Sequence, residues 1–519
     1  MDAHTRAMDA APDFELDVES LRTQLEDRTG LPVVVLQTHI SWVLLTQRLA
    51  FKLKKPVRLP FLDFSRAARR GQACLEELRL NRRLAPSLYL GVVPVRGTPA
   101  SPFWGGDGPV IDHAVVMRRF PDAALMSERL QRGRLSARAI ECLALRLADF
   151  HAAAPAATPD GPFGQPVQVQ QSVRRVLEQL DAARPGDARL APLRAWCEAR
   201  LRALEPELRR RLESGAVREG HGDLHLANLI VPGGDAEATA FDCIEFDPAL
   251  RWIDTLCDIG FATMDLQARG RRDLAFRFLD AYLQRNGDYA GLRVLRLYEV
   301  YRALVRALVR ALSPGHAAEP DYLACAQALV DAGAAPRLLI TCGPSGSGKS
   351  TVAQALAAQA GAVRIRSDVE RKRLFGLRAL QRSAEQGLDL YTPEAGRRTF
   401  EHLAACARAA LLGGYPVIVD AAFLSRATRQ DFEHLAWQLG VPFTILACTA
   451  DAETLRRRVA ARGAAGNDPS EADVDVLEKQ LETGEPLDAA ERACAIEVDT
   501  TAEPDVTALA RRWLALEFR

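Results

Sequence analysis

The chain of 519 residues carries no net charge, because 67 lysines and arginines balance 67 aspartates and glutamates. Without a net positive field, the charge gives no reason to expect nucleic acid or an anionic membrane as a partner. No apolar run approaches the roughly 18 residues of a membrane span. The 10 cysteines include no C-x-x-C pair and are typical of buried, reduced thiols. These absences predict a cytoplasmic protein that does not enter a membrane.

The composition is that of a globular protein, and the length suffices for two or three domains. Short β-type runs in the first 120 residues precede a long, mostly helical stretch. Residues 331–337 form a natural seam before another strand-like run. The expected organisation is an N-terminal arm at 1–31, a first domain at 32–330 with a β lobe (32–120) and a helical lobe (121–330), and a second domain at 337–519.

The most informative stretch is a G-x-x-x-x-G-K-[ST] sequence that runs from Gly343 to Ser350. In this P-loop spacing, backbone N–H groups wrap a polyphosphate, Lys349 reaches the outer phosphates and the Ser350 hydroxyl binds Mg²⁺. A chance glycine-rich turn would not explain the apolar run before the motif or the helix-forming segment after it. We therefore predict a site for ATP and Mg²⁺ formed by Gly343, Ser345, Gly346, Ser347, Gly348, Lys349, Ser350 and Thr351.

Two aspartates follow strand-like runs beyond the P-loop. Asp420 ends the apolar run 417–419, which is the form of a Walker B element that secures Mg²⁺. A buried strand alone would explain that run but not its terminal aspartate. Asp368 follows the run 363–366, where a carboxylate in small P-loop kinases orients or deprotonates an acceptor hydroxyl. We predict a catalytic role for Asp368 and a metal-binding role for Asp420.

Arg458 and Arg462 lie four residues apart, which places them on one face of a predicted helix. Arginines in that place would form a lid over the nucleotide and neutralise charge in the transition state. The alternative for the arginines of this helix is a solvated face, above all for Arg456 and Arg457.

A second phosphate-handling motif lies in the first domain. The spacing from Asp223 to Asn228 is the D-x-x-x-x-N of a kinase catalytic loop, in which the aspartate orients the acceptor hydroxyl and accepts its proton while the asparagine binds a metal ion. Asp242 follows a Pro-Gly-Gly turn, where the second metal-binding carboxylate is expected. The alternative is a polar turn before an ordinary hairpin, with His221 and His225 as structural residues.

The H-G-D-x-H-x-x-N-L sequence at 221–229 resembles the aminoglycoside phosphotransferase and choline-kinase-like branch of the protein-kinase fold. That resemblance implies a bilobal domain in which Lys52 contacts the α- and β-phosphates of ATP, Glu77 pairs with that lysine and the backbone at Met117 meets adenine. Lys54 and Glu76 are close rivals for the ion pair, since Lys52 and Lys54 point to one side of a strand.

One element of the kinase pattern is missing. No glycine-rich G-x-G-x-x-G sequence precedes the lysine strand, and residues 38–42, Thr-His-Ile-Ser-Trp, stand in its place.

The P-loop, the Ser-Asp pair ending in Asp368, the V-I-V-D-A sequence around Asp420 and the arginine helix together resemble the polynucleotide-kinase, gluconate-kinase and zeta-toxin-like group. This resemblance implies a P-loop NTPase fold (α/β), in which a parallel sheet lies between helices. This domain follows the mixed α+β kinase-like domain in the sequence. The combination of the two domains resembles bacterial proteins described as bifunctional aminoglycoside phosphotransferase/ATP-binding proteins.

The leading hypothesis is therefore an ATP-dependent kinase with two nucleotide sites, each of which transfers the γ-phosphoryl group to a hydroxyl of a small molecule. One alternative is a regulator or scaffold in which the P-loop domain binds or hydrolyses ATP and the kinase-like domain only binds a ligand. A second alternative is a nucleic-acid 5′-hydroxyl kinase, which requires an arginine-rich groove beside Asp368. Neither acceptor, nor the oligomeric state, follows from the sequence.

Overall fold

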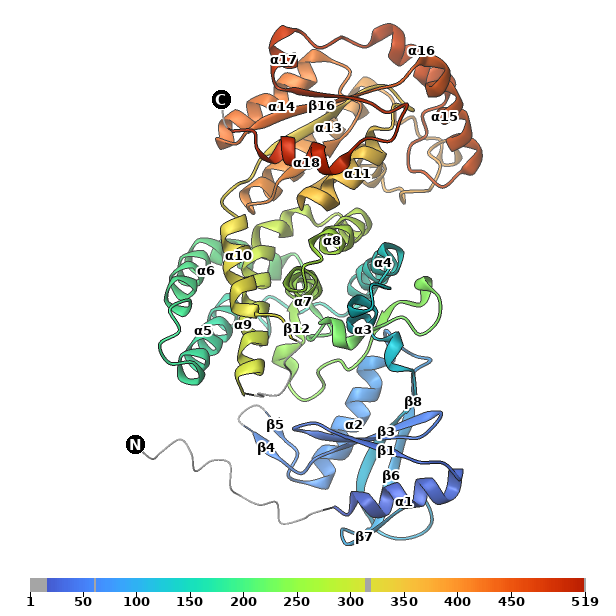
Figure 1. Ribbon diagram of the computed structural model, residues 1–519, viewed down its shortest axis with the longest axis vertical. Coiled ribbons are helices and arrows are strands. Elements are labelled where there is room, and N and C mark those ends of the chain that lie inside the picture. The colour runs from blue at the N-terminus through green and yellow to red at the C-terminus, as the bar shows by residue number, and fades with distance from the viewer. Residues whose placement is uncertain (1–15, 60–61, 313–318, 518–519) are drawn as a thin grey trace. The chain divides into compact units, whose positions relative to one another are not determined.

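The structure is a computed structural model that describes residues 16–59, 62–312 and 319–517 (Figure 1). The chain forms two compact units. The first unit comprises residues 1–139, 154–157 and 218–253, and the second comprises residues 140–153, 158–217 and 254–519. The boundaries of these units differ from the predicted domain boundaries. The predicted domain boundaries therefore stay a prediction. Residues 1–15 of the predicted N-terminal arm lie outside the described residues, and residues 18–29 of the arm form helix α1 (Val18–Thr29).

An antiparallel sheet of six strands in the order β1-β2-β3-β8-β6-β7 forms the centre of the first unit. Its strands are β1 (Val34–Gln37), β2 (Ser41–Leu45), β3 (Leu49–Lys54), β6 (Tyr89–Thr98), β7 (Ser101–Trp104) and β8 (Val110–Arg118). Strand β3 is paired on both sides, so that Lys52 lies opposite Val43 on β2 and Val115 on β8. The β lobe expected from the short apolar runs therefore has this sheet as its frame.

The two faces of β3 have different neighbours. Leu53 packs with Leu21 of helix α1 (Val18–Thr29) in an apolar cluster, and Phe51 packs against that cluster. Side chains alternate along a strand, so Lys52 and Lys54 point to the opposite face. That face is covered by helix α2 (Ala67–Asn81), which contacts β6 and β8.

Short elements complete the first unit. They are the strand pairs β4 (Arg58–Leu59) with β5 (Leu62–Asp63), β10 (Leu229–Ile230) with β11 (Thr239–Ala240), and β9 (Val217–Glu219) with β12 (Trp252–Asp254); the helix α3 (Met126–Gln131); and the 3₁₀ turns η1 (Asp122–Ala124), η2 (Leu226–Asn228), η3 (Asp235–Glu237) and η4 (Pro248–Leu250). The segment that follows β9 and includes η2 carries the H-G-D-x-H-x-x-N-L sequence at 221–229.

Helices make up the first part of the second unit. They are α4 (Ala137–Ala153), which begins in the first unit, α5 (Pro166–Ala183), α6 (Leu190–Glu213), α7 (Thr255–Ala268), α8 (Arg272–Asn286), η5 (Tyr289–Gly291), α9 (Leu292–Leu312) and α10 (Tyr322–Ala332). Residues 255–266 of α7 are all buried, as expected for a helix that is largely apolar on every side. Helix α7 contacts α8, α9 and α10, and it forms the core of this helical part.

A parallel sheet in the order β14-β15-β13-β16-β17 forms the rest of the second unit. Its strands are β13 (Leu338–Cys342), β14 (Val363–Arg366), β15 (Val417–Asp420), β16 (Phe443–Thr449) and β17 (Ala495–Asp499). The helices around it are α11 (Lys349–Ala360), α12 (Ser367–Leu374), η6 (Ala384–Gln386), α13 (Pro393–Leu412), α14 (Arg426–Leu439), α15 (Ala452–Ala465), α16 (Val474–Thr483), α17 (Ala489–Ala493) and α18 (Val506–Leu514). The predicted parallel α/β fold is confirmed.

The sequence did not indicate β17, the edge strand. Its side chains alternate between buried and exposed, with Ile496 and Val498 inside and Glu497 and Asp499 outside, which is the pattern of a strand with one face in solvent. In the part of the chain that the structure describes, no helix combines the length and the apolar character that crossing a membrane requires.

Candidate active sites

The P-loop joins the end of β13 to the start of α11 through three glycines in the left-handed region of backbone space. Gly343, Gly346 and Gly348 have φ values of 145°, 81° and 74°. A Cβ atom on Gly343 would lie 2.4 Å from the carbonyl oxygen of Cys448, and one on Gly346 would lie 2.7 Å from that of Leu455. The loop therefore tolerates no side chains at these positions, and it has the form of a backbone cradle for an anion.

Lys349 and Ser350 open helix α11, directly after this cradle. The Lys349 ammonium group donates to the carbonyl oxygen of Pro344 at 3.1 Å, and burial lowers the pKa of Lys349. The Ser350 hydroxyl donates to Oδ1 of Asp420 at 3.0 Å. The fold thus brings together the hydroxyl and the carboxylate to which the sequence assigned the metal ion, although they are 70 residues apart.

Asp420 has a second partner that the sequence did not single out. Nη1 of Arg364, on β14, lies 3.3 Å from Oδ2 of Asp420 and also donates to the carbonyl oxygen of Ser350 at 3.3 Å. Both Arg364 and Asp420 are buried. A signal was present in the sequence, since an arginine inside a strand of a parallel sheet is buried and needs a partner of opposite charge.

Asp368 lies in the first turn of α12, at the end of β14. Its Oδ1 atom is 3.9 Å from Nη1 of Arg371, and the Arg371 guanidinium lies over the ring of Tyr391 at 5.0 Å from its centroid. Strands β14 and β15 are parallel neighbours, so their C-terminal ends lie at the same end of the sheet. Asp368, the predicted proton acceptor, therefore lies at the same end of the sheet as Asp420.

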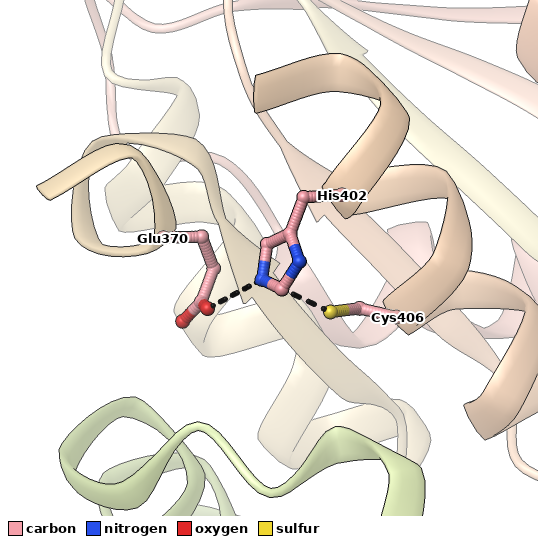
Figure 2. Close-up of side chains that lie close together, drawn as sticks. All are labelled: Glu370, His402 and Cys406. Carbon is pink, nitrogen blue, oxygen red and sulfur yellow. Dashed lines mark hydrogen bonds and ion pairs between the residues drawn. The ribbon is translucent and has the colours of Figure 1, made fainter. Parts of the chain in front are cut away.

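Figure 2 shows how helix α12 is held to α13. His402 Nε2 lies 3.1 Å from Oε2 of the fully buried Glu370 and 3.5 Å from Sγ of Cys406. These three residue types occur as metal ligands, but Arg373 donates to both oxygens of Glu370, at 3.1 and 3.3 Å. The Glu370 carboxylate is thus neutralised by an ion pair, and its contacts fix the helix that carries Asp368.

The two arginines of α15 have different partners. Arg458 donates to the carbonyl oxygen of Gly346 in the P-loop at 3.3 Å and to the carbonyl oxygen of Thr500 at 2.7 Å. Arg462 donates to the carbonyl oxygen of Ala472 at 2.8 Å. Arg458 therefore touches the P-loop itself, whereas Arg462 holds the connection between α15 and α16.

Two further P-loop contacts come from residues outside the predicted site. The Gln480 side chain accepts a hydrogen bond from the backbone N–H of Ser345 at 2.8 Å, and the Thr500 hydroxyl donates to the carbonyl oxygen of Ser347 at 2.9 Å. The sequence assigned no site role to either residue, and their position in the fold reveals these contacts. The exposed Thr351 on α11 completes the predicted P-loop set.

In the first unit, Lys52 and Lys54 share a single carboxylate. Their ammonium groups donate to the two oxygens of Glu77, at 2.9 Å for Lys52 and 2.8 Å for Lys54. Glu76, the rival partner, instead binds Arg79 and Arg251. The two lysines differ in their second contact, because Lys52 also binds Asp242 while Lys54 binds Glu245.

Exposure distinguishes the two lysines further. The Lys52 side chain is 14% exposed and its partner Asp242 is 40% exposed, whereas Lys54 and Glu245 are buried. Burial alone would lower the pKa of Lys52, but the carboxylates of Asp242 and Glu77 raise it well above its usual range. Burial would likewise raise the pKa of Glu77, yet the two lysines lower it to about 2. Lys52 is thus the more exposed of two charged lysines.

Asp223 and Asn228 are joined by two hydrogen bonds. The Asn228 amide donates to Oδ2 of Asp223 at 2.8 Å and to its carbonyl oxygen at 3.0 Å, and Nε2 of His225 lies 3.3 Å from the same Oδ2. The carbonyl oxygen of Asn228 in turn accepts from the backbone N–H of Phe241, the residue before Asp242. The two predicted metal-binding residues are therefore neighbours across β10 and β11.

Asp242 has a strained backbone. Its φ is 63°, which is uncommon for a residue other than glycine and is found at functional sites. The Tyr89 hydroxyl accepts its backbone N–H at 3.1 Å. His221 lies 2.9 Å through Nε2 from the carbonyl oxygen of Phe241, and its Nδ1 accepts from the backbone N–H of Asp223 at 3.3 Å, so this histidine joins the two halves of the motif.

Met117, at the end of β8, lies among apolar side chains. Together with Phe120 and Phe241 it packs against a cluster formed by Cys74, Ala85, Leu88, Tyr89, Val115 and Ile230. The rings of Phe120 and Phe241 meet edge to face, with centroids 5.2 Å apart. The segment predicted to meet adenine is therefore apolar and adjoins the turn that carries Asp242.

In the second unit, a buried histidine braces the helical part. His151 at the end of α4 lies 2.8 Å from the Tyr282 hydroxyl through Nδ1 and 3.1 Å from Oδ2 of Asp258 through Nε2. These contacts join α4, α7 and α8.

Two family models match the chain. Residues 61–298 match the phosphotransferase enzyme family, and residues 338–487 match an AAA domain. An uncharacterised protein of Mycobacterium bovis is 30% identical over 474 residues, which cover 88% of this chain and 92% of that protein. The chain belongs to the same family as this mycobacterial protein, and it contains a phosphotransferase-family domain followed in sequence by a P-loop kinase domain. Uncharacterised proteins of two Mycobacterium tuberculosis strains match to the same extent.

Solved structures match each part of this phosphotransferase separately. A gluconokinase from Sinorhizobium meliloti is 23% identical with a TM-score of 0.27, over 35% of this chain and 92% of the gluconokinase. A choline/ethanolamine kinase family protein from Mesorhizobium loti is 14% identical with a TM-score of 0.35, over 58% of this chain and 86% of the other. The predicted order, a kinase-like domain followed by a P-loop kinase domain, is confirmed by the family models.

Proposed function

We propose that this protein has two ATP-dependent phosphotransferase sites, and that each transfers the γ-phosphoryl group to a hydroxyl of a small molecule. The observation that carries the proposal is the hydrogen bond between Ser350 and Asp420 beside the glycine cradle of the P-loop. A hydroxyl and a carboxylate next to a phosphate cradle suit a hard divalent cation, and Lys349 adds a positive charge for the phosphates.

The residues of both sites fit Mg²⁺, which prefers oxygen ligands. Ser350 and Asp420 would hold it in the P-loop domain, and Asn228 with Asp242 would hold it in the phosphotransferase domain. A bound divalent ion would supply positive charge that neutralises the phosphates of ATP.

The side chains of the protein supply positioning and proton transfer. Asp368 in one site and Asp223 in the other accept the proton of the acceptor hydroxyl while its oxygen forms a bond to the γ-phosphorus. The bond from the γ-phosphorus to the β–γ bridging oxygen breaks, and ADP leaves with that oxygen. Lys349, Arg458 and Arg462 in the P-loop domain, and Lys52 in the other, stabilise the negative charge of the phosphates.

A labelling experiment tests the proposal. The purified protein is incubated with γ-labelled ATP and a fractionated cell extract, and the labelled products are compared for Asp223→Asn and Lys349→Ala. Each variant is expected to lose a different product, because each removes one site. Matched controls are Asp107→Asn and Lys479→Ala, which change exposed residues of the same types. If both site variants keep every labelled product, two-site phosphoryl transfer is wrong.

A second candidate is a phosphotransferase domain that binds a ligand without phosphorylating it. The feature that favours it is the hairpin between β1 and β2, which has no glycine. Its turn is closed by a hydrogen bond from Thr38 N–H to the carbonyl oxygen of Ser41, so it differs from the glycine-rich loop that covers phosphates in protein kinases. This candidate predicts ligand-dependent thermal stabilisation that Asp223→Asn leaves intact, with no labelled product assigned to that domain.

A further inference from the structure

A buried chain of charges connects the phosphotransferase part of the sequence to the P-loop site. Arg364 donates through Nη2 and Nε to the two oxygens of Asp280, at 2.9 and 3.3 Å, and through Nη1 to Asp420 at 3.3 Å. Asp280, Arg364 and Asp420 are only 8%, 3% and 2% exposed. Asp280 lies on α8, within the range that matches the phosphotransferase family, whereas the other two residues lie within the AAA-domain match.

All these residues belong to the second compact unit, in which α8 runs beside α11 (Figure 1). The two helices approach closely, because a Cβ atom on Gly361, the C-cap of α11, would lie 2.1 Å from Nε of Arg272 on α8. Arg373 of α12 also donates to the carbonyl oxygen of Gln284 at 2.6 Å. Helix α8 is therefore held against the P-loop domain around the buried ion pair.

The charge balance of this chain bears on the metal position. Arg364 is a buried cation whose charge is shared between two carboxylates, and one of them, Asp420, is also bonded to Ser350. A cation bound at Asp420 and Ser350 is repelled by Arg364, and Asp280 offsets that repulsion. Without Asp280, the whole charge of Arg364 would act on Asp420, and the site would be one unit more positive.

We propose that Asp280 is a positioning residue for the P-loop site: acting through Arg364, it holds the Asp420 carboxylate in place and balances the positive charge beside it, so that α8 of the phosphotransferase domain controls the divalent-cation affinity of the P-loop domain. This inference rests on the proposed function, in which Asp420 holds the metal ion. It makes the helical part of the phosphotransferase domain a component of the second kinase site.

The test is a Mg²⁺ titration of ATP hydrolysis by the full-length protein, with the signal that Lys349→Ala abolishes assigned to the P-loop site. For Asp280→Asn, the Mg²⁺ concentration at half-saturation is expected to rise about tenfold, because one negative charge near a divalent cation is lost. Binding of a fluorescent ADP analogue without Mg²⁺ is expected to stay within about twofold of the unchanged protein, since the phosphate cradle is intact. Asp280→Glu retains the charge and is expected to keep most of the Mg²⁺ affinity.

A matched control lies on the same helix. Asp273 forms a half-exposed ion pair with Arg271 at 2.7 Å, and Asp273→Asn is expected to leave the Mg²⁺ titration unchanged. If Asp280→Asn lowers only the melting temperature and gives the same titration as Asp273→Asn, the contact is a structural anchor and the inference is wrong.

A double variant distinguishes the electrostatic effect of Arg364 on the bound cation from a loss of order at the metal site. Asp280→Asn combined with Arg364→Met removes both charges that surround Asp420 and is expected to bring the Mg²⁺ requirement back toward that of the unchanged protein. A requirement that rises further, in a protein that circular dichroism shows to be folded, contradicts the charge argument. Asp420→Ala tests the premise: if it leaves the Mg²⁺ titration unchanged, the proposed metal site itself is wrong.

Discussion

The P-loop site and the phosphotransferase site both place a lysine near an aspartate, but they hold these charges differently. In the P-loop, Lys349 donates to a backbone carbonyl and Asp420 accepts from a hydroxyl. In the other site, Lys52 is bound to two carboxylates, Glu77 and Asp242. The glycine cradle of the first site is shaped by the backbone, whereas the lysine of the second site is held by ion pairs between separate segments. The cradle should thus be sensitive to added atoms, and the lysine pair of the other site to lost charges.

The largest effect should come from breaking the shared carboxylate of the phosphotransferase site. Glu77→Gln leaves Lys54 buried without one of its two carboxylate partners, and we expect the free energy of unfolding to fall by about 3–5 kcal/mol. Denaturant unfolding measures this change. The control is Glu128→Gln, which removes a more exposed ion pair with Arg132 and should cost about 0–1 kcal/mol. An equal loss of unfolding free energy in the two variants would mean that Glu77 does not compensate the charges of Lys52 and Lys54.

The same carboxylate predicts a dependence of stability on acid. The pKa of Glu77 is lowered from 4.5 to about 2 in the folded protein, so its protonation is easier in the unfolded chain. The stability that it contributes is complete above pH 4.5 and is lost as the pH falls toward about 2. Denaturant unfolding across this range should show a smaller acid dependence for Glu77→Gln than for the unchanged protein. Parallel curves would contradict the assignment.

An added methyl group should break the P-loop site and spare the other. Gly346→Ala combines an unfavourable φ of 81° with a contact of 2.7 Å to the carbonyl oxygen of Leu455, and we expect nucleotide affinity in this domain to fall about 100-fold. Equilibrium dialysis with ATP, in a Lys52→Ala background, measures it. Gly440→Ala is the matched control, because its φ is 64° but no atom lies within 4 Å of the added group. If both variants bind ATP equally, the cradle is not essential.

The smallest effect concerns the two faces of α15. Arg456 forms an exposed ion pair with Glu478, with half of its side chain in solvent, so Arg456→Ala should change stability by less than about 1 kcal/mol and leave turnover unchanged. Arg458→Ala removes the contact with the P-loop carbonyl of Gly346 and should lower turnover at this site about tenfold. Phosphoryl-transfer rates of the two variants show whether only the face of α15 that contacts the P-loop contributes to the reaction.

The candidate sites differ in how much of them could be predicted. The P-loop could be recognised because its eight residues are contiguous, and their spacing alone determines where the backbone N–H groups lie. The pairing of the strand lysines could not be decided. Alternation places Lys52 and Lys54 on one face of β3, but only the packing of α2 decides that Glu77, rather than Glu76, meets both. Residue roles in both sites stay predictions until they are tested.

By itself, the sequence determined the two motifs, the order of the two domains, the strands that carry Lys52 and Asp420 and the strand that precedes Asp368. These follow from local patterns, namely alternation along strands and fixed spacings in turns. The tertiary structure alone decided which distant residues complete the sites: Gln480 and Thr500 at the P-loop, and Asp280 behind Arg364. The physical reason is that a buried charge or a loop carbonyl is satisfied by whatever group the packing brings near it, regardless of its distance along the chain.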